Sequence, residues 1–334
     1  MLLGVLLGVV ISIASQTSRQ RAANAATPIV IAGPIKEMAV QVEFSANDRV
    51  AVGWGRPPTK PALQVWGLTP PRRVFDAVLP SRAEIALSQQ GDRVAAATAT
   101  HLMIWHVTTK KLLKKATGLT KVPSKMAFTP DGRRLIALWY LDGKKGELRT
   151  TDVATGQLRQ ALTVGGHPTA ELAASNDFIA FSPTPHAYAL VDLSTFTISK
   201  TRRRAVTQLL FEPEGTLLAM NAYGSYNRIE PKTGKRLRRM QLGRHCNYFN
   251  LLTSKLSVCW HGPRRAKLRS NRRGAVAHTI KLPVRVQHSG FAVSQDSRWF
   301  SLQADDEDGT ILVYAIAPHL AASTSPTGQN ASAD

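Results

Sequence analysis

The chain has 334 residues and carries 43 Lys and Arg against 22 Asp and Glu, a formal net charge of +21. Hydrophobic residues make up 43% of it and charged residues 19%, which is too apolar for a disordered protein and provides material for a large core. Two cysteines exclude a disulfide-dense scaffold. The length is unusual for one ordinary compact domain and normal for a repeat architecture.

Residues 1–26 have the pattern of a targeting segment. The run Leu2–Ala14 is uncharged, apolar and too short to span a bilayer comfortably, and residues 23–25 read Ala-Asn-Ala, a typical cleavage site. We therefore expect a secretory signal and a periplasmic or secreted mature protein without an integral membrane span. Arg19 and Arg21 follow the apolar run instead of preceding it, so a mis-assigned start, a signal anchor and a mitochondrial presequence stay open.

From there the chain repeats one hairpin pattern. Residues 126–137 read as an apolar run, a Pro-Asp-Gly turn and a second apolar run, in which Pro presets the turn and Gly accepts a positive φ. Similar units occur at residues 43–50, 85–94, 173–178, 210–218, 249–256 and 292–300. Their spacing of 38 to 44 residues is that of four-stranded propeller blades.

A second apolar phrase follows each hairpin and predicts the third strand of each blade. These phrases are residues 63–66, 102–105, 148–152, 188–192, 226–230, 267–270 and 311–314. The last unit lacks a fourth strand, and Pro28–Ala32 is an apolar segment without a partner. We therefore expect an all-β, seven-bladed β-propeller over residues 27–320, closed by pairing of the N- and C-terminal strands, and a disordered tail over 321–334.

This repeat resembles the WD40-like seven-bladed β-propellers. Trp66 and Trp105 hold the place of the signature Trp of that superfamily, followed by Gly67 and His106 instead of Asp. The looser YVTN-type and quinoprotein-like propellers stay open. The resemblance implies a rigid scaffold that binds proteins or peptides and seldom catalyses a reaction.

The positive charge is concentrated in one sector. Between Lys200 and Lys281 there are 19 Lys and Arg against three acidic residues. Six arginines are expected on loops of one face of blades 5 and 6: Arg202, Arg203, Arg204, Arg244, Arg264 and Arg265. They predict a site for a polyanion or an acidic partner protein, because clustered arginine binds anionic groups in bidentate fashion. The alternative is that charged outer strands only prevent edge pairing and keep the protein soluble.

The sequence says less about other partners and about catalysis. Export would separate the protein from nucleic acid, and we expect a monomer. No cofactor and no metal are expected, and no nucleotide-binding, nucleophile-elbow or zinc-protease motif occurs. We expect a non-catalytic binding scaffold. The alternative is a propeller enzyme, such as a lactonase or a quinone-dependent dehydrogenase, with acids and histidines converging on the central channel.

Two residue groups have structural interpretations. Trp54, Trp139 and Trp260 end the second strands of three blades, which favours packing between blades over an aromatic rim beside Arg264. Cys246 and Cys259 share the first hairpin of blade 6, where the expected register pairs 246 with 257 and 259 with 244. Diagonal neighbours are about 7 Å apart and a disulfide needs about 4 Å, so a disulfide requires a register shift and stays open.

Overall fold

The computed structural model describes fourteen stretches of the chain. They are residues 28–31, 39–55, 61–140, 145–165, 171–184, 186–221, 224–241, 248–251, 256–260, 265–270, 276–282, 285–294, 298–306 and 310–316. These residues form strands, turns and loops and contain no helix, which confirms the all-β class.

The strands form seven four-stranded antiparallel sheets, numbered here by the order of their inner strands. Sheet 1 contains β2 (Ala39–Phe44), β3 (Arg49–Trp54), β4 (Ala62–Leu68) and β5 (Pro71–Val78). Sheet 2 contains β6 (Glu84–Leu87), β7 (Arg93–Ala97), β8 (His101–His106) and β9 (Leu112–Thr117). Sheet 3 contains β10 (Lys125–Phe128), β11 (Arg134–Tyr140), β12 (Lys145–Asp152) and β13 (Leu158–Gly165).

The remaining four sheets follow in chain order. Sheet 4 contains β14 (Leu172–Ala174), β15 (Phe178–Thr184), β16 (Ala187–Asp192) and β17 (Thr197–Arg202). Sheet 5 contains β18 (Gln208–Phe211), β19 (Leu217–Met220), β20 (Ser225–Glu230) and β21 (Lys235–Gln241). Sheet 6 contains β22 (Tyr248–Leu251), β23 (Leu256–Trp260), β24 (Arg265–Ser270) and β25 (Val276–Lys281). Sheet 7 contains β26 (Val286–Val293), β27 (Trp299–Ala304), β28 (Ile311–Ala315) and β1 (Ile29–Ile31).

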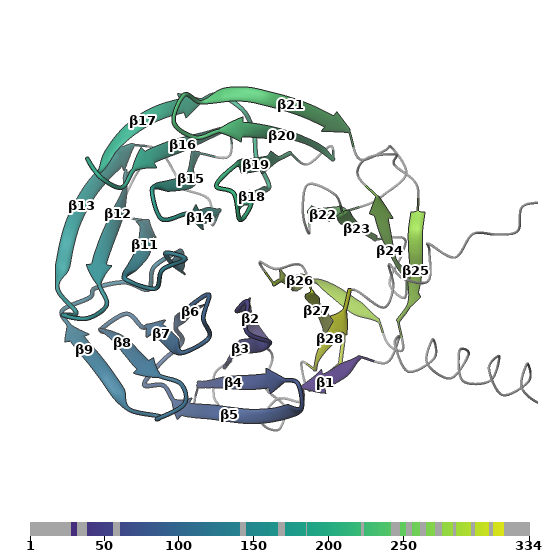
Figure 1. Ribbon diagram of the computed structural model, residues 1–334. Helices are drawn as coiled ribbons and strands as arrows, with labels where there is room; N and C mark the ends of the chain where they lie inside the picture. Colours follow the sequence, from purple (N-terminus) through teal and green to yellow (C-terminus); the bar gives the residue numbers. More distant parts are fainter. Residues whose placement is uncertain are drawn as a thin grey trace, which may run out of the picture.

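The sheets are arranged radially about a common axis, which is the arrangement of a β-propeller (Figure 1). The first strand of each sheet, such as β2, β6, β14 or β18, lies nearest the axis, and the last strand, such as β9, β17 or β21, lies at the perimeter. Among the described residues there is no helix that could cross a membrane.

Hairpin turns between the first two strands follow one local rule. A buried hydroxyl at the start of the turn accepts a hydrogen bond from the backbone N–H that opens the second strand. The N–H of Arg93 donates to Ser88 Oγ at 3.0 Å, and that of Arg134 donates to Thr129 Oγ1 at 3.1 Å. The turn glycines Gly91 and Gly132 have φ of 69° and 68°, which favours glycine. The Gly-containing hairpins predicted from the sequence are therefore present.

The core lies between neighbouring sheets. Hydrophobic clusters join sheets 1 and 2, 2 and 3, 3 and 4, 4 and 5, 6 and 7, and 7 and 1. Their members include Ile85, Phe181 and Phe300, all with 0% exposure, and burial of each such side chain stabilises the fold by about 1.5–3 kcal/mol. On the far side of sheet 5, Leu218, Met220 and Tyr226 form a cluster that includes no described residue of sheet 6.

The N-terminal strand completes sheet 7. β1 pairs antiparallel with β28, with Ile29 opposite Val313 and Ile31 opposite Ile311. Ile31 is fully buried in the cluster between sheets 7 and 1, whereas Val30 points outward with 59% of its surface exposed. The apolar segment that the sequence left without a partner therefore forms the outer strand of the last sheet.

Two of the three tryptophans expected to pack between sheets do so. Trp54 is 2% exposed and packs between sheets 7 and 1, and Trp139 is 6% exposed and packs between sheets 2 and 3. The side chain of Trp260 lies outside the described residues.

The register expected for the cysteine hairpin was wrong. Cys259 lies opposite Phe249, because β22 begins only at Tyr248 and position 244 precedes the strand. Cys246 and the side chain of Cys259 lie outside the described residues.

Candidate functional site

The predicted arginine site is only partly within the described residues. Arg202 is the last residue of β17 and Arg265 the first residue of β24, so neither lies on a loop as expected, because each strand extends further than its apolar pattern. Arg203 and Arg204 lie on the connection into β18, as expected. Arg244, Arg264 and the side chain of Arg265 lie outside the described residues.

Two of the described arginines make hydrogen bonds within the protein. Arg202 Nη2 donates to the carbonyl of Gly234 at 3.0 Å, and Arg204 Nη1 donates to Asn227 Oδ1 at 3.4 Å. Both acceptors belong to sheet 5. Arg203 is exposed and has no hydrogen bond or ion pair to another described residue.

The exposed cations of this region form a basic band along the outer strands of sheets 4 and 5. Its members are Lys200, Arg202, Arg203, Lys235, Arg236, Arg238 and Arg239, all exposed. The two outer strands meet where Arg202 binds the turn that opens β21, so the band is continuous from one sheet to the next. Figure 1 shows β17 and β21 following one another along the perimeter.

A second set of charged groups lies near the propeller axis. Lys125 Nζ on β10 is 2.7 Å from Glu43 Oε1 on β2 and 3.8 Å from Glu84 Oε1 on β6. The side-chain amide of Gln41 donates to both carboxylates, at 2.9 and 2.8 Å. This axial cluster therefore joins three sheets through side chains alone.

Burial changes the protonation of this axial cluster. It raises the pKa of Glu84 to about 7, even though the Lys125 ammonium acts in the opposite direction. It also raises the pKa of Glu171, on the segment that enters sheet 4, to about 7. Burial alone would lower the pKa of Lys125, but the Glu43 and Glu84 carboxylates raise it overall. Lys125 is therefore a permanent cation and a poor nucleophile.

Sequence reasoning missed these residues, although a signal was present. A polar residue recurs four residues before the residue that begins the first hairpin turn in each of sheets 1 to 5. Gln41, Glu84, Lys125 and Gln208 lie in the innermost strands, and Glu171 directly precedes β14. Three of them accept a hydrogen bond from a backbone N–H of the following sheet. The donors are Ile85 to Gln41 at 2.9 Å, Met126 to Glu84, and Leu209 to Glu171 at 3.3 Å. This repeated polar position thus links the innermost strands.

Arginines link the turns of neighbouring sheets. Arg49, at the start of β3, donates to the carbonyl of Gly91 in sheet 2 at 2.6 Å, and Arg93 donates to Gly132 in sheet 3 at 2.8 Å. Arg134 reaches a carbonyl of sheet 4 at 3.0 Å, and Arg298 reaches one of sheet 1 at 2.7 Å. Arg49, Arg93 and Arg134 are the first residues of the second strands of sheets 1, 2 and 3, whereas Arg298 directly precedes β27, which begins with Trp299.

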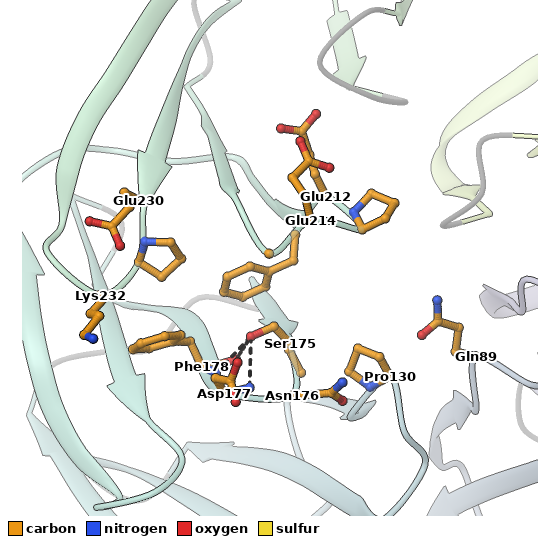
Figure 2. A pocket seen from close by; sticks show the side chains of 15 residues that line it. Gln89, Pro130, Ser175, Asn176, Asp177, Phe178, Glu212, Glu214, Glu230 and Lys232 are labelled. Carbon is orange, nitrogen blue, oxygen red and sulfur yellow. Dashed lines mark hydrogen bonds between the residues drawn. The ribbon is translucent and has the colours of Figure 1, made fainter.

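Sheet 4 departs from this rule. Its equivalent residue is Phe178, which lies opposite Asp192 just as Arg134 lies opposite Asp152. A pocket of about 480 Å³ is present at this place, between the turns of sheets 4 and 5. Figure 2 shows Ser175, Asp177 and Phe178 on one side and Glu212 and Glu214 on the other.

Sheet 5 also differs from sheets 1 to 4 at the residue that begins its first hairpin turn. Glu212 stands where sheets 1 to 4 carry Ser or Thr, and its side chain is 7% exposed. Arg228 binds Glu212 at 3.0 Å and Glu214 at 2.9 Å, so one cation is shared by two carboxylates. Asp177 and Glu230 add further carboxylates to the lining and Lys232 adds one ammonium. The pocket is therefore acidic in a strongly basic protein.

Comparison with known proteins assigns no family, since no family model and no curated protein match the chain. Within the described stretches, no group of three or more His, Cys, Asp and Glu side chains is placed to hold a metal ion.

Proposed function

We propose that the protein is a non-catalytic binding scaffold whose basic band binds polyanions or an acidic partner protein. The observation that supports this most directly is β21, the outer edge strand of sheet 5, where Lys235, Arg236, Arg238 and Arg239 are all exposed. Closely spaced guanidinium groups bind phosphate, sulfate or carboxylate groups and gain affinity by releasing counterions.

The scaffold is proposed to be a closed, seven-bladed ring of the WD40-like type, exported and monomeric. The seven four-stranded sheets and the pairing of β1 with β28 support the ring. Closure further requires sheet 5 to pack on sheet 6, through the apolar side chains of Leu218, Met220 and Tyr226. The apolar run and the Ala-Asn-Ala sequence at the N-terminus support export.

The test compares two sets of four substitutions at the perimeter. One set replaces Lys235, Arg236, Arg238 and Arg239 on β21 by Ser. The matched set replaces Lys114 and Lys115 on β9 of sheet 2 and Lys110 and Lys111, which precede that strand. On an immobilised heparin resin the first set should elute at clearly lower salt than the second, because only it interrupts the band. Equal shifts for the two sets would show that net charge alone governs retention and that there is no site.

The axial cluster supports a second candidate, a propeller enzyme with its site at the axis. Two carboxyl groups there, Glu84 and Glu171, have a pKa of about 7, which suits general acid–base catalysis at neutral pH. Their hydrogen bonds to Met126 and Leu209 favour a structural role instead. Lactone hydrolysis that is lost in both Glu84→Gln and Glu171→Gln would support the enzyme.

A further inference from the structure

We propose that the slot between the turns of sheets 4 and 5 binds the arginine side chain of a partner protein. The slot is the part of the 480 Å³ pocket between Phe178 and Gly215. This inference goes beyond the proposed polyanion binding, since it concerns a different surface and a ligand of opposite charge. The protein itself shows what occupies the equivalent place between other sheets.

Arginine fills the equivalent place between sheets 1 and 2 and between sheets 2 and 3. A Cβ built on Gly91 would lie 2.9 Å from Cδ of Arg49, and one built on Gly132 would lie 3.6 Å from Nη1 of Arg93. Both glycines occupy the same turn position as Gly215, with a positive φ in all three. A Cβ built on Gly215 meets no atom within 4 Å. The space that an arginine of the preceding sheet fills elsewhere is therefore open at Gly215.

The groups around this space suit a guanidinium. The carbonyl oxygens of Gly91 and Gly132 each accept a hydrogen bond from an arginine, whereas the Gly215 carbonyl accepts none from any described residue. The Glu214 side chain next to it is 55% exposed and binds Arg228 through one oxygen. The Asp177 carboxylate, across the slot, is exposed and has no ion pair to a described residue. An incoming guanidinium would thus meet a carbonyl and two carboxylates.

The hydrogen bonds between turns also stop at this place. Asn47 Nδ2 donates to the carbonyl of Gln90, Gln90 Nε2 donates to that of Pro130, and the Asp131 N–H donates to Asn176 Oδ1, which links sheets 1 to 4 in order. No such bond joins the turns of sheets 4 and 5 among the described residues. The two walls of the slot are therefore not tied to each other from within.

Phe178 provides an aromatic face beside these acceptors. A guanidinium stacks on an aromatic ring more readily than an ammonium does, and Arg149 lies 4.8 Å from the ring centre of Trp139 elsewhere in the protein. The planar fork also fits a carbonyl and a carboxylate at once, so arginine is favoured over lysine. With a net charge of +21 the protein repels cations in general, so saturable binding of one would report a local site.

The probe is a capped Gly-Ser-Arg-Ser-Gly peptide, with peptides that carry lysine or citrulline in place of arginine for comparison. Backbone amide shifts of the full-length protein are followed at low salt during titration. We expect saturable shifts at Gly215 and Phe178, unchanged signals at Gly91 and Gly132, and binding at least about tenfold weaker for citrulline, which lacks the charge.

Two substitutions test the site. Phe178→Arg should supply the missing arginine from within and abolish binding, while circular dichroism shows that the fold is kept. Glu214→Gln should weaken binding severalfold, whereas Asp131→Asn, the same change at the occupied turn of sheet 3, should not. The proposal is overturned if arginine and citrulline peptides bind equally, if the three glycines shift alike, or if Glu214→Gln and Asp131→Asn have the same effect. A negative result for arginine binding in the slot does not change the expected outcome of the heparin test of the basic band.

Discussion

Lys125 Nζ lies 2.7 Å from Glu43 Oε1, although the two residues belong to sheets 3 and 1 and sheet 2 stands between these sheets. The contact is made near the axis, where side chains of non-adjacent sheets come within reach. Exposure of the two side chains is 28% and 26%, so the pair is partly desolvated. It therefore contributes to holding the first three sheets at a fixed distance.

Replacement of Lys125 by Met should destabilise the protein by about 2 kcal/mol, less than for a fully buried pair, because the carboxylates of Glu43 and Glu84 lose their cation. Urea denaturation of the variant measures this loss. The control is Lys115→Met on the perimeter strand β9, which should have almost no effect. Equal stability of both variants and the wild type would contradict a role for the pair.

The raised pKa of Glu171 predicts a pH-dependent contribution to stability. Because its folded-state pKa of about 7 exceeds the ordinary value of 4.5, the contribution is complete below pH 4.5 and is lost as pH rises through 7. Glu171→Gln mimics the protonated carboxyl, so its Tm relative to the wild type should rise between pH 5 and pH 8. Each unit of pKa shift corresponds to about 1.4 kcal/mol.

The measurement is thermal unfolding of both proteins over that pH range. Asp177→Asn removes an exposed carboxylate away from the axial cluster, and its Tm difference from the wild type should stay flat. A flat difference for Glu171→Gln as well would mean that this carboxyl is ionised throughout.

Arg93→Ala should cost about 1–2 kcal/mol, because the bond to the Gly132 carbonyl is charge-assisted but partly exposed. Equilibrium denaturation checks this loss. Arg133→Ala is the matched control, since that side chain is 85% exposed, and it should change stability by less than about 0.5 kcal/mol. If the two variants were equally stable, the arginines between turns would have no structural role.

Ile31→Ala should destabilise the protein by about 2–4 kcal/mol, since the side chain is fully buried between sheets 7 and 1. Val30→Ala on the same strand should have little effect, because Val30 is 59% exposed. The difference between their unfolding midpoints measures how firmly β1 is held. A difference near zero would be inconsistent with a tightly packed β1.

Export predicts a processed N-terminus. Mass spectrometry of the protein from its native host should find a chain that begins near Ala26, after the Ala-Asn-Ala sequence. Soluble protein that retains Met1 would contradict export and would make intracellular nucleic acid a candidate for the basic band.

The strands and the hairpin turns could be predicted because the same sequence pattern recurs along the chain, as in the turns that contain Gly91, Gly132 and Gly215. Strand ends could not, because Arg202 and Arg265 extend strands beyond their apolar pattern. The slot at Phe178 was also missed. Phe178 stands where sheets 1 and 2 carry Arg49 and Arg93. The importance of this difference can be recognised only from the structure, in which those two arginines bind the turn of the next sheet.

The pairing of β1 with β28 has a consequence for synthesis. Sheets 1 to 6 are each built from consecutive strands and can form as soon as their own segment of chain is available. Sheet 7 needs the first strand and the last, so it must wait for nearly the whole chain. Until β1 pairs with β28, the outer edge of sheet 7 is unpaired, whether β28 has been synthesised or not. An unpaired strand edge is a template for aggregation. Chains truncated before Ile311 should therefore be the forms most readily removed by proteases and chaperones.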